Sequence, residues 1–309
     1  MTPEGSPRTA ATMSAHQPAL LHQPRLGAFW MTVSLVCFTG NALLLKVLAS
    51  VRHADPWLAL VFRACIGLVF TWVVFAPKGT LRLKRSFQSW LLASRGVLGA
   101  FGTISYYITI GPLGAGKATL IGNTWCVFAA IMATFVLHEK LGVVKVLGIT
   151  LAIAGLALLT GMTPGSLVVF GKHEAIALGG AVMAAAVVVV IRQLTRTETS
   201  ATIFASQCLY ALLIGIPVAA MNFTSLGWTD AGLLAAAALC ATFGQLAMTE
   251  GFRFLSVAAG GAFQNTVPVL TTLGGIMFFA EPFSTMQSLG AVLVLWGSFQ
   301  TVLGAKRAS

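Results

Sequence analysis

The sequence has few charged residues for its length. Only 8 of its 309 residues are Asp or Glu and 19 are Lys or Arg, so 9% are charged, against about 25% in soluble domains. Apolar residues make up 57%, and the mean hydropathy is +0.87. This balance excludes an ordinary soluble enzyme and indicates that lipid is the solvent.

Residues that could build metal, disulfide or proton-transfer sites are also scarce. The five cysteines lie singly in apolar runs, and the acids and histidines lie in tails, loops or helix ends, with Glu250 near Arg253 the least secure case. We therefore expect no zinc site, disulfide framework or intramembrane proton relay, which favours facilitated or exchange transport over proton coupling. Residues 111–118 nearly match a phosphate-binding loop, but Ala118 replaces the hydroxyl and no strand precedes them. No cofactor is expected.

The apolar residues gather into long runs separated by short polar breaks. A helix crosses the hydrocarbon with about 20 mostly apolar residues. Ten such spans are predicted, at 27–50, 56–76, 87–110, 114–137, 142–162, 174–192, 200–221, 229–250, 256–279 and 284–304. Residues 1–26 have no signal-peptide pattern and, like 305–309, are expected to be a flexible cytoplasmic tail.

The basic residues are distributed unevenly between these spans. With the N-terminus in the cytoplasm, thirteen Lys and Arg fall on that side, and only Arg52 and Lys172 fall on the other. The positive-inside rule then predicts an inner-membrane protein with both termini cytoplasmic. Because the net charge of +11 is spread between apolar spans, we expect no nucleic-acid partner.

The second half of the chain repeats the first. Shifting the sequence by 142 residues aligns 99–160 with 241–302 at eleven identical positions, including Asn123 with Asn265 and Glu139 with Glu281. Repeats at 27–162 and 163–304 would contain five spans each, and an odd number inverts the second repeat in the membrane. Inverted repeats are typical of secondary transporters, in which two halves move around a central site. The predicted fold is an all-α membrane protein with ten helices in two inverted repeats.

Several motifs in these spans resemble those of one known family. They are the Lys46…Pro56…Arg63 series, the Glu139-Lys140-Leu141 turn with Gly148 and Gly155, and Glu281-Pro282-Phe283 with Gly290 and Gly297. The chain resembles the drug/metabolite transporter superfamily of EamA-type carriers, including the YddG-type exporters of aromatic amino acids. His138, which has Ala280 as its counterpart, departs from the repeat. The resemblance implies a ten-helix carrier of amino acids or other metabolites.

Four cations fall inside the expected spans. Lys46 and Lys117 lie near outer ends, from which their side chains could reach the interface, whereas Arg63 and Arg95 lie about two turns deep. A buried cation costs about 2.5–3.5 kcal/mol at the bilayer centre on insertion scales, so the arginines should face a cavity or a partner. Lys46, Lys117 and Arg63 would place three cations in the outer half of the membrane, where they would attract a substrate carboxylate.

Polar and aromatic residues in the spans suggest a pathway. Arg95, Gly99, Gly102 and Tyr106 share one helical face, which could line the pathway or permit close packing. Asn123 and Asn265 need partners, either each other's helices or a substrate. Further candidates are the buried amides Asn41, Gln207, Gln245 and Gln264 and the apolar wall of Tyr107, Trp125 and Phe263.

The span at 256–279 contains a candidate hinge. Pro268 removes a backbone donor and should kink or open the helix. Gly260, Gly261, Gly274 and Gly275 flank it and could serve either motion or packing. Glycines every seven residues in the fifth and tenth spans favour close helix contact instead.

These features predict an alternating-access carrier and not an enzyme, because the chain has no pair of acids or histidines at catalytic spacing. The expected activity is export of amino acids, aromatic or otherwise small and amphipathic, or of related metabolites. An integral-membrane enzyme acting on a lipid-like substrate and an uptake carrier or exchanger remain alternatives. The expected partners are a small-molecule substrate and the bilayer, and a monomer would suffice.

Overall fold

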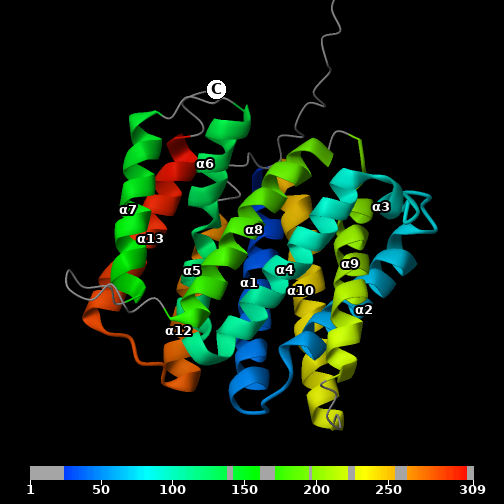
Figure 1. Cartoon of the computed structure of the whole chain (residues 1–309), viewed down its shortest axis with the longest axis horizontal. Helices are drawn as coiled ribbons and strands as arrows, with labels where there is room; N and C mark the ends of the chain where they lie inside the picture. The colour runs from blue at the N-terminus through cyan, green and yellow to red at the C-terminus, as the bar shows by residue number, and fades with distance from the viewer. Residues whose placement is uncertain are drawn as a thin grey trace, which may run out of the picture.

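The computed structural model is a bundle of helices (Figure 1). It describes residues 24–137, 142–160, 171–194, 197–221, 227–254 and 263–304. Within these ranges every regular element is a helix. The predicted all-helical class is therefore confirmed for the part of the chain that the structure describes.

The helices follow the expected apolar runs. In the first half they are α1 Pro24–Ser50, α2 Pro56–Phe75, α3 Arg85–Gln88, α4 Trp90–Leu113, α5 Ala115–Asn123, α6 Trp125–Leu137 and α7 Val143–Thr160. In the second half they are α8 Lys172–Leu194, α9 Ser200–Met221, α10 Trp228–Phe254, α12 Thr266–Phe279 and α13 Thr285–Gly304. Among the described residues, six helices are long and apolar enough to cross a membrane, and shorter apolar helices accompany them.

Local capping explains where two of the long helices begin. The Asp55 side chain accepts a hydrogen bond from the Trp57 amide, and Pro56 occupies the first turn, where no backbone donor is needed. The Ser89 hydroxyl caps α4 through the Leu92 amide. Because these capping residues lie next to the helices in the sequence, the starts of α2 and α4 could be expected from the sequence.

Large apolar side chains are exposed around the outside of the bundle. They come from helices far apart in the sequence and include Val36, Leu147, Leu213, Met277 and Val292. A soluble protein rarely exposes apolar surface on this scale. The exposed apolar surface fits contact with lipid.

The two halves interleave through their largest helix contacts. The most extensive interfaces are α7 with α13, α1 with α10, α4 with α8, and α2 and α4 with α9. Each of them joins a helix before residue 161 to one after residue 171. Figure 1 shows α7 beside α13 at one side of the bundle. The boundary between the halves therefore runs through the interior of the protein.

Glycines bring α7 and α13 into backbone contact. A Cβ atom on Gly155 would lie 2.6 Å from the Val294 nitrogen, and one on Gly290 would lie 2.6 Å from the Leu159 nitrogen. Only a residue without a side chain fits such an approach. The seven-residue glycine spacing thus corresponds to a close helix interface, as expected.

The span expected at 114–137 is not one continuous helix. It divides into α5 and α6 at Thr124, and in the second half α12 begins directly after Asn265. These breaks lie at positions related by the 142-residue repeat. Pro268 lies in the first turn of α12, where its missing donor would be unpaired in any case. The second-half break therefore comes before Pro268. The corresponding first-half break at Thr124 has no proline beside it.

The bundle has two ends, which we name by residues that close them. The Glu281 end carries residues 51–55, Gly114 and 280–284, and the Arg85 end carries residues 76–89 and 197–199. At the Glu281 end, Asp230 hydrogen-bonds to Arg52 and raises the pKa of that guanidinium above its ordinary value. At the Arg85 end, Arg85 pairs with Glu198, and Thr199 donates to the Thr80 carbonyl.

Candidate functional site

Arg95 lies at the interface between the halves. It belongs to α4, and only 4% of its surface is exposed. Its Nη2 donates to the Gln207 Oε1 of α9 at 2.8 Å, and the Gln207 Nε2 donates to the Gly99 carbonyl and the Thr103 hydroxyl, each at 3.3 Å. A side chain at Gly99 would collide with Arg95 Nη1. Gly99 therefore makes room for the guanidinium.

The guanidinium of Arg95 keeps unused donors. Its Nε and Nη1 atoms are buried and have no hydrogen-bond partner among the residues that the structure describes. Across the described ranges, the carboxylates that form ion pairs bind other cations. A buried charge without a counterion is expensive, and a buried donor left unpaired adds about 1–3 kcal/mol. The site can therefore gain energy from an anionic acceptor.

Arg63 provides a second cation beside this one. Its Nη1 donates to the Tyr107 hydroxyl at 3.3 Å, and the two guanidiniums repel each other electrostatically. Arg95 also donates to Gln207 of α9. The pair therefore combines α2 and α4 of the first half with α9 of the second.

Tyr106 and Tyr107 form an aromatic wall next to the arginines. Their ring centroids are 6.2 Å apart, and the Tyr106 hydroxyl is 3.0 Å from the Thr119 hydroxyl of α5. Tyr107 is buried in the main apolar core. We name Arg63, Arg95, Tyr107 and Gln207 the interface cluster. It combines positive charge with aromatic surface.

The paired asparagines meet where the two broken spans come together. Asn123 Nδ2 donates to Asn265 Oδ1 at 3.0 Å. These amides were expected to bind either each other's helices or a substrate, and in the structure they bind each other. Asn265 Nδ2 is buried and has no partner among the described residues. The contact links α5 to the start of α12.

The other expected polar candidates lie apart from the interface cluster. Asn41 donates to the Ala237 carbonyl at 2.8 Å, which joins α1 to α10. Gln264 donates to the Ser34 hydroxyl at 3.2 Å. These two bonds hold helices together. The remaining candidates are half-buried: Trp125 in α6, Gln245 in α10 and Phe263 before α12.

The lysines near the Glu281 end have their own counterions. Lys46 Nζ lies 3.4 Å from the Glu281 carboxylate and donates to the Gly111 carbonyl at 2.9 Å. Lys117 pairs with Glu174 at 2.8 Å. A cavity of about 300 Å³ lies between these pairs. The two lysines are thus already compensated, which leaves Arg63 as the outer cation available to a carboxylate.

Glu281 also caps a helix in the other half. Its carboxylate accepts hydrogen bonds from the backbone amides of Ala115, at 2.8 Å, and Gly116, at 3.4 Å, at the start of α5. Gly114, whose φ is +86°, lies against this carboxylate, and a Cβ there would be 2.7 Å from it. Negative charge at a helix N-terminus is stabilising. Glu281 therefore fastens α5 to the loop after α12.

The hinge candidates lie in crowded surroundings where they are described. A Cβ on Gly274 would lie 2.8 Å from Leu43 of α1, and one on Gly275 would collide with the Glu281 carboxylate. These glycines fit close packing. Gly260 and Gly261, like Glu139 and Lys140, lie outside the described residues.

Sequence reasoning gave Glu281 no partner and overlooked the break at Thr124. Glu281 was expected as an acid at a helix end, a repeat match of Glu139 and part of a family motif, without an ion-pair partner. Two signals pointed further: its repetition at Glu139 and the need of Lys46 for a counterion. The break at Thr124 follows no proline, and the apolar run continues through it.

Comparisons with known proteins give a consistent result. The model of the EamA-like transporter family matches residues 25–161 and 172–303. The pseudopaline exporter CntI of Pseudomonas aeruginosa, from strains UCBPP-PA14 and PAO1, is 25% identical over 259 residues, which cover 82% of this chain and 88% of the exporter. A crystal structure of another protein has a similar fold, with a TM-score of 0.60 at 19% identity, covering 90% of this chain and 99% of that one.

Proposed function

We propose, for a chain that belongs to the EamA-like transporter family, that it exports amino acids or related small amphipathic metabolites by alternating access. The similarity to an exporter in Pseudomonas aeruginosa supports the direction. The substrate we infer carries a carboxylate. An integral-membrane enzyme would need paired catalytic groups, which the interface cluster does not provide.

One observation carries the proposal: the arginine pair at the interface has no carboxylate partner in the described part of the chain. Arg95 donates only to an amide and Arg63 to a phenol. A substrate carboxylate can supply the charge that both lack, and bidentate geometry suits a guanidinium. Binding there favours an anionic or zwitterionic metabolite.

The aromatic wall favours an apolar portion in the same molecule. Tyr106 and Tyr107 lie next to the arginines, and rings pack well against an aromatic or aliphatic substrate side chain. This arrangement supports an aromatic amino acid within the broader class. Asn123 and Asn265 offer polar groups where the broken spans meet.

We infer the architecture that such transport needs. It has ten membrane spans in two inverted repeats, 27–162 and 163–304, with tails at 1–26 and 305–309. The interleaved contacts of α1 with α10 and of α4 with α8 support it, because an inverted two-fold relation exchanges these pairs. The charge bias supports an inner-membrane orientation with both termini cytoplasmic. One chain provides both halves, so a monomer can carry out the cycle.

Counterflow in proteoliposomes tests this function. Vesicles loaded with one unlabelled compound from a panel of amino acids and other carboxylates should accumulate the labelled form only when the compound is a substrate. Arg95→Met should reduce counterflow by about 10- to 100-fold, the value of a charge-assisted hydrogen bond. Arg52→Met, an arginine outside the cluster, is the matched control and should stay within twofold of the parent.

Two results would overturn the proposal. Counterflow in Arg95→Met at the parental rate would remove the arginine from substrate binding. Chemical conversion of the labelled compound, without accumulation, would favour the membrane enzyme.

A further inference from the structure

One face of α2 exposes a continuous apolar stripe. Val69, Trp72 and Val73 are all strongly exposed, Trp72 at 59%. Together with Ala76 they follow the spacing i, i+3, i+4, i+7, which places them on one helical face. The stripe runs to the Arg85 end, where α2 stops at Phe75. In a membrane this surface faces lipid.

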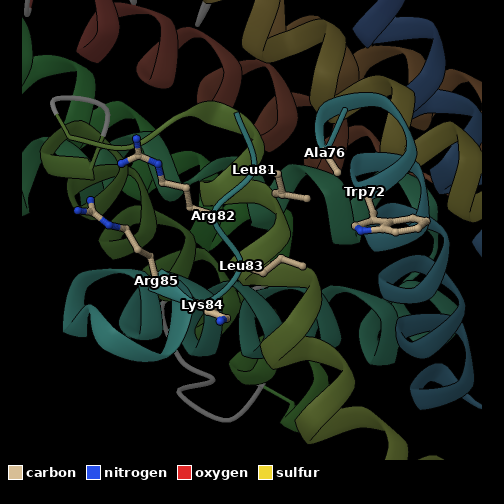
Figure 2. A pocket seen from close by; sticks show the side chains of 7 residues that line it. All are labelled: Trp72, Ala76, Leu81, Arg82, Leu83, Lys84 and Arg85. Carbon is tan, nitrogen blue, oxygen red and sulfur yellow. The ribbon is translucent and has the colours of Figure 1, made fainter. Parts of the chain in front are cut away.

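The segment after α2 alternates apolar and basic side chains. Leu81 and Leu83 are half-buried, whereas Arg82 and Lys84 are exposed. Figure 2 shows the two leucines extending toward the side on which Trp72 lies, while Arg82 extends the other way. The leucines thus form the far wall of a cleft.

This cleft joins the apolar stripe to the cations. It has a volume of about 410 Å³ and is lined by Trp72 and Ala76 on one side and by residues 81–85 on the other (Figure 2). One rim is therefore apolar and continuous with the stripe. The opposite rim carries three basic residues.

Most of this positive charge is uncompensated. Arg85 pairs with Glu198, but neither Arg82 nor Lys84 forms an ion pair within the described ranges. Lys78 lies over the Phe75 ring, with its Nζ 5.7 Å from the ring centroid. The cleft consequently combines an apolar wall with a local surplus of positive charge at a helix end.

We propose that this cleft binds an anionic phospholipid, with an acyl chain along the α2 stripe and its headgroup phosphate at the rim that carries Arg82 and Lys84, toward which the exposed Arg82 side chain turns on binding. A soluble anion would use the cations alone, and a zwitterionic lipid would leave their charge uncompensated. Each cation near an anionic lipid contributes about fivefold in affinity. The site is separate from the interface cluster and does not depend on the proposed transport.

Quenching of tryptophan fluorescence by brominated lipids tests this site. The full-length protein is reconstituted in phosphatidylcholine vesicles that contain increasing brominated phosphatidylglycerol or, in parallel, brominated phosphatidylcholine. The contribution of Trp72 is the difference between the parent and Trp72→Phe. Trp90→Phe is the matched control, because Trp90 is 82% exposed at the same end on α4.

The Trp72 contribution should be quenched at a lower mole fraction of phosphatidylglycerol than of phosphatidylcholine. The double variant Arg82→Gln/Lys84→Gln should shift the phosphatidylglycerol midpoint by about tenfold or more, while Arg25→Gln, an exposed cation away from the cleft, should leave it unchanged. Soluble glycerol 1-phosphate should not reverse the quenching.

The proposal is overturned if Trp72 responds equally to both lipids, or if its preference survives in the double variant. Reversal by glycerol phosphate would assign the cations to a free phosphate instead. It is also overturned if the Trp90 contribution shows the same preference for phosphatidylglycerol, because the lipid would then be attracted to the whole Arg85 end and not to the cleft.

Discussion

The interface cluster and the Glu281 end treat buried positive charge in opposite ways. At the Glu281 end, Lys46 and Lys117 each lie within ion-pair distance of a carboxylate. In the interface cluster, the partners of Arg63 and Arg95 within the described ranges are neutral groups, a phenol and an amide. Cations with internal counterions fix the shape of the protein, and those without can accept a counterion from outside.

The difference in partners matters because the cations are largely removed from water in both places. A charge taken out of water is compensated only by good pairing and additional hydrogen bonds. Lys46 receives both from Glu281 and the Gly111 carbonyl. Arg95 donates one hydrogen bond, and its other two nitrogens have no partner among the described residues. Substitutions that take the counterion away from Lys46, or that give one to Arg95, test this comparison.

Removing the Glu281 carboxylate should have the largest effect on stability. Glu281→Gln leaves Lys46 without a counterion, and the two side chains are only 10% and 11% exposed. We expect the free energy of unfolding to fall by about 3 kcal/mol. Thermal unfolding of the purified protein, followed by circular dichroism, measures the loss.

The double variant Lys46→Met/Glu281→Gln is the control for this change. Because it removes both charges, it should lose less stability than the two single variants added together. Additive losses would mean that the pair is not coupled, and the Glu281 end would then not differ from the interface cluster.

Giving Arg95 an internal carboxylate should make the interface cluster resemble the Glu281 end. In Gln207→Glu the new carboxylate replaces an amide that already accepts from Arg95 at 2.8 Å. The new ion pair should raise the unfolding temperature by more than the loss of the two 3.3 Å bonds from the Gln207 amide to Gly99 and Thr103 lowers it. We also expect a 10- to 100-fold loss of counterflow, because the substrate must displace a built-in anion. Gln207→Leu, which removes the amide, should instead lower the unfolding temperature. Parental counterflow in Gln207→Glu would contradict the assignment.

The smallest effect is expected at the Arg85 end. Arg85 pairs with Glu198, and water reaches one side of this pair, because the Arg85 side chain is 48% exposed whereas that of Glu198 is 5% exposed. A partly solvated pair contributes about 1 kcal/mol, so Arg85→Gln should lower stability by about that amount, less than Glu281→Gln, and change counterflow by less than twofold. The same unfolding and counterflow measurements apply. A loss as large as that of Glu281→Gln would show that exposure does not distinguish the two ends.

The sequence predicted local features well. The apolar runs located most helices, and the glycine spacing indicated the close approach of α7 and α13. Arg63 and Arg95 could be selected because a cation in hydrocarbon is costly wherever it lies. Each of these inferences needs only neighbouring residues or the chemistry of one side chain.

The pairing of distant side chains could not be predicted. Arg95 and Gln207 are 112 positions apart, and Glu281 reaches the Ala115 amide across 166 positions. No local pattern says which helix faces meet. The lysines could therefore be expected to bind a carboxylate, because their counterions are far away in the sequence, Glu281 in a loop and Glu174 on α8. The break at Thr124 was missed because the expected span has no proline there and its apolar run continues beyond it.

The contact between α7 and α13 has a consequence for how the protein is made. The Gly155 face of α7 is synthesised well before its partner face on α13, which includes Gly290. Until α13 has entered the membrane, α7 has only lipid along that face. Assembly of the bundle must therefore wait for a helix about 140 positions later, and in ribosome-bound chains that stop before Thr285 this face of α7 should be labelled by a photoreactive lipid, which α13 excludes in the finished protein.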